Sequence, residues 1–404
     1  MSNNSISRRE FVSTGAVALS GLVTMGFPAI GQTLSANEVI HVGLIGSGAR
    51  GAGLATLIQA IPTLKLVACC DIQAENLANG MSKADKGAKS YTNYKKLLED
   101  KNIDAVIIAT PLFLHYPMAV DALAAGKHVY VEKTMTFSPE QSMDLIKRMK
   151  NSKLVFQVGF QYRYYGLYKR VKEVIDQNWL GKITHFECQY NRNSDWRFPV
   201  KDPKMERIVN WRMYKEYCGG PLSELCAHEI DMVNFILGSH PLKVTGIGGV
   251  DYWKDGRETY DNIRTVYEYP NGVKSSVTSI LSNAYNGYNI RILGDKATID
   301  IQRNKAFIYA ESKSNKRGTV DGVTGATIAT TTQGKGEEIV FDKPGERSLE
   351  PTTYALEDFA ACIKDKRKPL SNVDTGRDVS IAIYMGNKAA ETEKFQVWKP
   401  EYSI

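Results

Sequence analysis

Short apolar runs alternate with helical stretches over residues 36–160. The runs lie at 39–45, 64–70, 105–109, 128–131 and 155–159. Strands that are apolar at nearly every position are typical of a parallel sheet buried on both faces, and helices between them supply the crossovers that such a sheet needs. We therefore expect an N-terminal α/β domain over 36–160, built on a doubly wound parallel sheet.

A different periodicity begins after residue 161. Asn271-Gly272 is a strong hairpin signal between two of the later strands. The pattern predicts an α+β domain over 161–350, with an open, mainly antiparallel sheet. Alternating apolar and polar positions predict its strands at 243–250, 264–269, 273–280, 289–293, 297–301 and 305–309.

Three further expectations concern the second half of the chain. A helix is expected at 224–237, and a long exposed loop at 312–335, which is rich in Ser, Thr, Gly and Lys. Helices at 354–364 and 375–393 belong to a C-terminal segment, 351–404, which we expect to pack back on the body.

The composition is that of an ordinary globular protein. Of its 404 residues, 43% are hydrophobic and 24% are charged, which argues against a disordered or membrane-spanning class. The net charge is +7, but no basic run indicates binding of nucleic acid. The six cysteines show neither a CxxC metal pattern nor a disulfide-dense spacing.

Residues 1–35 are typical of an export signal and linker rather than of a folded element. Ser7-Arg8-Arg9-Glu10-Phe11 resembles a twin-arginine signal, and the uncharged stretch at 12–32 is too short and too weakly apolar for a membrane span. We expect an exported, periplasmic protein without a stable membrane span. If the arginine pair is a chance feature of a disordered tail, the protein is cytoplasmic.

The first apolar run ends in a glycine-rich turn, Gly46-Ser47-Gly48-Ala49-Arg50-Gly51. In this GxGxxG spacing the first glycine allows a tight turn, the second lets a pyrophosphate approach the backbone, and the third lets the next helix pack closely. Asp71 ends the second run, 25 positions after Gly46, where a carboxylate accepts hydrogen bonds from a ribose. The motif predicts a Rossmann domain, and the acid favours NAD over NADP. Alternatively, Asp71 is a turn or helix-cap residue.

Side chains that follow the other strands are further candidates, because ligands bind at the carboxyl edge of a doubly wound sheet. Thr110 with Pro111, Lys133 and Gln161 hold such positions. From Gln161 onward, aromatic rings and polar donors crowd together, which suits a sugar that offers a C–H face and hydroxyl groups. Ordinary packing of an aromatic-rich sheet is the alternative. The candidate substrate residues are Arg163, Tyr164, Asn193, Trp196, Arg197 and Trp211.

The candidate catalytic chemistry is concentrated at 218–231. In a continuous helix Glu224, His228 and Asp231 would share one face. Removing hydride from an alcohol carbon needs a base for the hydroxyl proton, and histidine suits that role near neutrality. Glu224 would orient the imidazole, and Lys133 would stabilise the developing alkoxide. The alternatives are a surface Glu–His pair and a metal site made of the three residues.

In combination, these motifs resemble the Gfo/Idh/MocA family, the group of glucose-fructose oxidoreductase and inositol dehydrogenase. The resemblance covers nearly all of 38–400. It implies a nicotinamide-dependent oxidoreductase that acts on sugars or polyols and assembles into a homo-oligomer through the open sheet. The motifs that carry it are the glycine-rich turn, Ala109-Thr110-Pro111 with His115, Glu132-Lys133, Gln161-Tyr162-Arg163, and Gly219-Gly220 through Glu224 and His228.

The resemblance also assigns residues. It places the cofactor against the glycine-rich turn, Asp71 and a second set of residues, and makes His228 the active-site histidine. Thr134 stands where the family usually has proline, and Glu224 where it usually has aspartate. The second cofactor set is Thr110, Pro111, His115, Glu132, Lys133 and Gln161.

Three functions are consistent with these features. The first is a sugar or glycoside dehydrogenase with tightly bound NAD, because an exported enzyme finds no ready pool of the cofactor. The second is an NAD-dependent glycoside hydrolase that oxidises, eliminates and reduces again without net redox change, as some relatives do. The third is a sugar-sensing protein that binds the cofactor without catalysing a reaction. The presence of both Lys133 and His228 argues against this third function.

Overall fold

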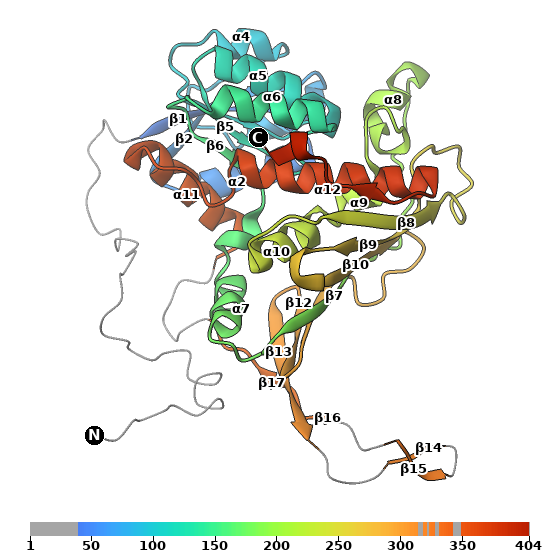
Figure 1. Ribbon diagram of the computed structural model, residues 1–404. Coiled ribbons are helices and arrows are strands. Elements are labelled where there is room, and N and C mark those ends of the chain that lie inside the picture. The colour runs from blue at the N-terminus through green and yellow to red at the C-terminus, as the bar shows by residue number, and fades with distance from the viewer. Residues whose placement is uncertain (1–38, 314–317, 321–322, 328–330, 342–348, 404) are drawn as a thin grey trace, which may run out of the picture.

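The computed structural model describes residues 39–313, 318–320, 323–327, 331–341 and 349–403 (Figure 1). The expected export signal lies outside these residues. Two large sheets dominate the fold, one of six strands and one of ten. In Figure 1 the six-stranded sheet and its helices form the upper layer, and the ten-stranded sheet extends below and to the right.

The first sheet is parallel throughout, in the order β3-β2-β1-β4-β5-β6. Its strand order reverses between β1 and β4, which creates the crevice where doubly wound sheets bind ligands. The expected parallel sheet is therefore confirmed. Its strands are β1 (Ile40–Ile45), β2 (Leu64–Cys70), β3 (Lys89–Tyr91), β4 (Ala105–Ile108), β5 (His128–Val131) and β6 (Phe156–Val158).

Helices cover both faces of this sheet, as the apolar strands require. All four residues of β4 are buried. The longest of these helices, α6, begins at a cap that the sequence supplies: the Ser138 hydroxyl accepts from the Gln141 N–H, and proline occupies the first helical position. The helices are α2 (Ala49–Ile58), α3 (Ala74–Met81), α4 (Tyr94–Leu98), α5 (His115–Ala124) and α6 (Pro139–Met149).

The second sheet runs in the order β16-β13-β12-β11-β7-β10-β9-β8-β18, and β17 (Glu337–Glu338) pairs with β13. It is antiparallel except for the β7–β10 pair. Residues of β9 alternate between buried and exposed, because helices cover one face and the other is open (Figure 1). The strands are β7 (Ile183–Tyr190), β8 (Lys243–Gly249), β9 (Asn262–Glu268), β10 (Lys274–Ile280), β11 (Tyr288–Gly294), β12 (Ala297–Gln302), β13 (Lys305–Lys313), β16 (Thr331–Gln333) and β18 (Gln396–Val397).

The helices of the second half include two that link the sheets. The helix α11 (Pro351–Asp365) lies against α2, and α12 (Val373–Thr392) contacts both α6 of the first layer and β8 of the second. One apolar core runs across this seam, from Val158 of the first sheet to Val277 of the second. The two sheets are thus packed together. The other helices are α7 (Gly166–Asp176), α8 (Glu206–Val209), α9 (Gly220–Glu224) and α10 (Ala227–Leu237).

Two expectations for the second half are wrong. The helix expected at 224–237 is broken at Leu225 and Cys226, so that α9 ends at Glu224 and α10 begins at Ala227. The segment 312–335 is not a plain loop: β13 continues to Lys313, and β14 (Gly318–Val320), β15 (Val323–Thr327) and β16 follow. Small polar residues dominate the sequence there, so no apolar alternation marks these strands.

Two glycines of α2 allow a matched test of the close packing between this helix and the glycine-rich turn after β1. A Cβ at Gly51 would lie 1.9 Å from the Gly46 carbonyl oxygen, whereas a Cβ at Gly53 would meet no atom within 4 Å. We expect Gly51→Ala to lower the free energy of unfolding by about 1–3 kcal/mol, because backbone must move. Gly53→Ala should raise it by about 0.4–1 kcal/mol. Denaturant titration measures both, and equal effects would contradict the close packing.

Candidate active site

The glycine-rich turn after β1 is closely packed at Gly46 and open at Gly48. Gly46 has φ +90°, and a Cβ on it would lie 2.8 Å from the Ala109 carbonyl carbon. At Gly48 a Cβ would meet only the Asn76 side chain, at 3.8 Å, so the turn is accessible from the side of the crevice. This is the space that a pyrophosphate needs above a helix N-terminus.

Asp71 is tied to this turn. Its carboxylate accepts the Ser47 N–H at 2.8 Å and the Gln73 N–H at 2.8 Å. The Ser47 hydroxyl points into the protein, where it is fully buried. Asp71 therefore lies beside the turn, at the end of β2, with its carboxylate oriented by backbone. The groups present fit a dinucleotide, because exposed backbone amides can donate to phosphate and a carboxylate can accept from the ribose hydroxyl groups.

Arg50 and Glu132 link the turn to the loop after β5. The Arg50 Nε donates to Glu132 Oε1 at 2.8 Å, and its Nη2 donates to the Thr352 hydroxyl at 3.3 Å. The Arg50 side chain is thus directed across the carboxyl edge of the sheet rather than into solvent alone. Glu132, a predicted cofactor contact, forms an ion pair with Arg50 of the glycine-rich turn.

His115 is buried beneath the crevice. It is 2% exposed, with Nδ1 2.7 Å from the Thr134 carbonyl oxygen and Nε2 2.8 Å from the Thr110 carbonyl oxygen. A neutral imidazole donates to only one of the two. Burial lowers the pKa of His115, and the two carbonyl groups oppose that shift. His115 joins the loops after β4 and β5, so it positions the loop residues Thr110 and Pro111 rather than facing the crevice.

The loop after β5 is docked on the carbonyl groups that end α9. The Lys133 ammonium donates to the Glu224 carbonyl oxygen, and the Thr134 hydroxyl donates to the Ser223 carbonyl oxygen at 3.1 Å. The peptide bond between Lys133 and Thr134 is cis. These contacts place the ammonium at the seam between the two sheets.

Glu224 does not orient the imidazole. Its carboxylate accepts from Arg212 Nε at 2.9 Å, and the Arg212 guanidinium lies over the Trp211 ring, 4.2 Å from its centre. The helix break at Leu225 explains the difference, since Glu224 and His228 no longer lie one turn apart on a single helix.

His228 is 8% exposed at the start of α10, with the Tyr162 ring centre 4.8 Å from its own. Its Nδ1 is buried and has no hydrogen-bond partner in the described residues. Burial holds the pKa of His228 well below its ordinary value, and the charges of Lys133, Arg50 and Arg303 lower it further. The imidazole is therefore neutral near pH 7 and able to accept a proton.

Asp231, the third residue expected on the face of a continuous helix, is paired with Arg163 instead of facing His228. Asp231 receives three hydrogen bonds from Arg163, at 2.7 to 3.0 Å, and both side chains are buried. Glu224, His228 and Asp231 do not converge, and no group of metal-ligating side chains occurs in the part of the chain that the structure describes. Arg163 is consequently a buried structural residue, not a free donor for substrate.

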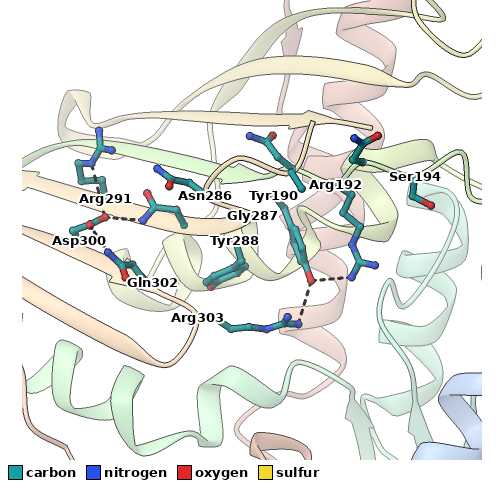
Figure 2. Close-up of a pocket in the computed structure, with 14 residues that line it drawn as sticks. Tyr190, Arg192, Ser194, Asn286, Gly287, Tyr288, Arg291, Asp300, Gln302 and Arg303 are labelled. Atoms are coloured by element: carbon teal, nitrogen blue, oxygen red, sulfur yellow. Dashed lines mark hydrogen bonds and ion pairs between the residues drawn. The ribbon is translucent and has the colours of Figure 1, made fainter. Parts of the chain in front are cut away.

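The other sequence candidates for substrate binding are dispersed. The Tyr164 hydroxyl accepts the Ser371 N–H at 2.9 Å inside the protein, and Arg197 pairs with Glu206. Trp196 is partly buried against the main core, and Trp211 lies under Arg212. Asn193 alone of the six lines the cavity of about 690 Å³ at the ends of β7 and β11 (Figure 2).

Sequence reasoning missed three side chains near the imidazole. Tyr162 contacts it directly, and Arg303 acts on it by charge. Glu229 is fully buried, with both carboxylate oxygens lacking a partner on any other described residue. Burial raises the pKa of Glu229 well above its usual value. Position beside His228 could have drawn attention to Glu229, but nothing in the sequence signals Arg303.

Two models of one protein family match the chain. Residues 40–160 match the model described as "Oxidoreductase family, NAD-binding Rossmann fold", which defines the class of the first sheet and its turn. Residues 168–300 match the "GFO/IDH/MocA C-terminal domain". Together the matches cover more than half of the sequence, and the chain belongs to the Gfo/Idh/MocA family. The expected family and its NAD-binding domain are confirmed.

Known relatives and structures agree with this membership. The 2,7-anhydro-N-acetylneuraminate hydratase of Escherichia coli (strain K12) is 30% identical over 52% of this chain and 53% of the relative. The scyllo-inositol 2-dehydrogenase (NAD(+)) of Bacillus subtilis (strain 168) is 24% identical over 82% of this chain and 88% of the relative. Several curated relatives are matched over only about half their length, 52% to 57%.

A structure of levoglucosan dehydrogenase in complex with NADH and levoglucosan superposes with a TM-score of 0.73. It is 20% identical, and the match covers 89% of this chain and 99% of that chain. At this identity the likeness shows the shared fold.

The buried ion pair gives a stability test. We expect Arg163→Ala to lower the free energy of unfolding by about 3–5 kcal/mol, because Asp231 would be left charged and buried without a partner. The matched control is Arg148→Ala, which breaks the exposed pair with Asp144 and should cost less than about 1 kcal/mol. Urea denaturation compares them. Equal losses would mean that Arg163 is not structural.

Proposed function

We propose that the protein oxidises a hydroxyl group of a sugar or glycoside and that it holds NAD tightly. The observation that carries this proposal is the position of Lys133, whose ammonium is docked on α9 and acts by charge on His228. The same sheet edge carries the open glycine turn and Asp71. A base, a cation and a dinucleotide cradle thus occupy one seam.

The residues divide the chemistry between them. His228, neutral and partly accessible, takes the proton from the substrate hydroxyl. Lys133 donates a hydrogen bond to the oxygen as negative charge develops there. Arg212 and Glu224 act as positioning residues, because they fix the end of α9 to which Lys133 is bonded. When bound, the nicotinamide supplies the acceptor for the hydride.

The cofactor would be held by residues of the first layer. Backbone amides of Gly48, Ala49 and Arg50 would donate to the phosphates, and Asp71 would accept from the adenosine ribose, which favours NAD over NADP. Thr110, Pro111 and Gln161 line the nicotinamide end in this proposal. His115 and Glu132 support these loops from below and from the side.

A redox-neutral reaction is the second candidate. The Escherichia coli relative is named a hydratase, a reaction without net oxidation, and it shares 30% identity. In such a reaction His228 and Lys133 would serve an oxidation, an elimination and a reduction in turn. The bound cofactor would end the cycle in its starting oxidation state. A non-catalytic sugar sensor has no structural feature in its favour, since base and cation are both in place.

Export and assembly complete the proposal. The twin-arginine motif at Arg8 and Arg9 supports export to the periplasm in a folded, cofactor-loaded form. Among the helices that the structure describes, none combines the length and apolarity required to cross a bilayer. The open face of the ten-stranded sheet, where Ile247 and Val266 are exposed, supports a homo-oligomer formed through that sheet.

Absorbance of reduced nicotinamide tests the function directly. The NAD bound to the protein should become reduced when a sugar or aryl glycoside substrate is added. The variant His228→Ala should slow this reduction by roughly a hundredfold or more while the cofactor remains bound. Steady release of aglycone without an electron acceptor would identify the redox-neutral hydrolase instead. Near-normal turnover of His228→Ala would remove His228 from the mechanism.

The charges around His228 predict the pH dependence. Because burial and the charges of Lys133, Arg50 and Arg303 lower the pKa of the imidazole, the base stays neutral as the pH falls. The acid limb of kcat/KM should lie below the ordinary histidine value of roughly 6.5. Arg303→Gln should move that limb upward. A limb at or above the ordinary value in the unmodified protein contradicts this assignment.

A further inference from the structure

A cavity of about 690 Å³ opens where β7, β11 and β12 end, and Figure 2 shows its lining. Its volume lies in the range of small-molecule sites, roughly 300–1,000 Å³. The wall is rich in amide side chains, including Asn191, Asn193, Asn286 and Gln302, which suit the hydroxyl groups of a sugar. Three arginines and one aspartate also line it, so its formal net charge is +2.

Two of these arginines converge on a neutral group. Arg192 Nη2 donates to the Tyr190 hydroxyl at 3.2 Å, and Arg303 Nη2 donates to the same oxygen at 3.3 Å (Figure 2). Within the described part of the chain, neither guanidinium forms an ion pair. Each has five N–H donors, so most of their hydrogen-bonding capacity remains available to a ligand.

The third arginine of the cavity is already neutralised. Arg291 pairs with Glu187 and lies 3.9 Å from Asp300. Asp300 in turn accepts from the Asn289 amide at 2.7 Å. The positive charge without a counterpart is therefore confined to Arg192 and Arg303, on either side of Tyr190.

A series of ring contacts leads from this cavity to the catalytic imidazole. Ring centres are 5.6 Å apart for Tyr190 and Tyr288, 5.3 Å for Tyr288 and Tyr162, and 4.8 Å for Tyr162 and His228. The charge of Arg303 acts on His228. The paired arginines therefore lie in the same neighbourhood as the imidazole, joined to it by packed rings and by the charge of Arg303.

We propose that the substrate carries a negatively charged substituent, a carboxylate, sulfate or phosphate, that is bound between Arg192 and Arg303. Guanidinium groups bind such oxyanions through paired, charge-assisted hydrogen bonds. This inference rests on the proposed function, since it names the class of sugar taken by the same site. The anion would also supply the counter-charge that Arg192 and Arg303 lack within the described part of the chain.

Calorimetry on the NAD-loaded protein tests the proposal. The ligands are matched sets of methyl glycosides of glucose, galactose and mannose, each as the neutral sugar, the uronate, the sulfate ester and the phosphate ester. One anionic form should bind at least about tenfold more tightly than its neutral counterpart, as a charge-assisted pair predicts. The preferred ester or uronate identifies the source of the charge.

Variants separate the arginines from general charge. Arg303→Gln and Arg192→Gln should each weaken binding of the anionic form much more than binding of its neutral counterpart, and so remove most of the anion preference. Arg148→Gln, on the outer surface of α6, removes the same charge at a distance and should preserve the preference. Circular dichroism and retained NAD confirm that each variant is folded.

Three results would overturn the inference. They are equal affinity for neutral and anionic forms in every set, a preference that persists in the Arg192→Gln/Arg303→Gln double variant, and a preference lost equally in Arg148→Gln. The oxidation assay separates failure of the proposed function from failure of the inference about charge. Oxidation of neutral sugars without any anion preference leaves the proposed function intact and removes only the inference about charge.

Discussion

The docking of the β5 loop on the end of α9 is the contact on which the rest of the site depends. Lys133 and Thr134 belong to the first sheet, and they donate to the carbonyl oxygens of Glu224 and Ser223, which belong to the second half of the chain. The last carbonyl groups of a helix have no partner within the helix. The cation that would meet substrate is therefore held by a backbone acceptor, whose position does not depend on a side-chain rotamer of α9.

Electrostatics around the imidazole follow from the same arrangement. Lys133, Arg50 and Arg303 come from three separate parts of the chain, and all lower the pKa of His228. Glu224, which the sequence suggests as the partner of the imidazole, is bonded to Arg212. Glu229 is buried, and burial raises the pKa of its carboxyl group, which disfavours the charged form. The site thus has a positive field, which suits an alkoxide and stabilises negative charge wherever substrate carries it.

Much of the fold and the cofactor cradle could be predicted from sequence, because their signals are local. The turn at Gly46 to Gly51 and the acid at Asp71 are defined by spacing, and the structure brings them together through the Ser47–Asp71 bond. Partners distant in sequence could not be foreseen. Arg163 finds Asp231, 68 positions later, and becomes structural. A continuous helix would place Glu224 beside His228, but the helix is interrupted at Leu225, where the sequence carries no breaker residue.

The two departures from the family pattern belong to one network. A proline at position 134 would have no hydroxyl, whereas the Thr134 hydroxyl donates to the Ser223 carbonyl oxygen. Glu224 is one methylene longer than aspartate, and its carboxylate reaches Arg212, which covers Trp211. Both substitutions add contacts around α9, the helix that receives Lys133. We therefore interpret them as coupled: Thr134 ties the loop to α9 from one side, and Glu224 ties α9 to the Trp211 segment from the other.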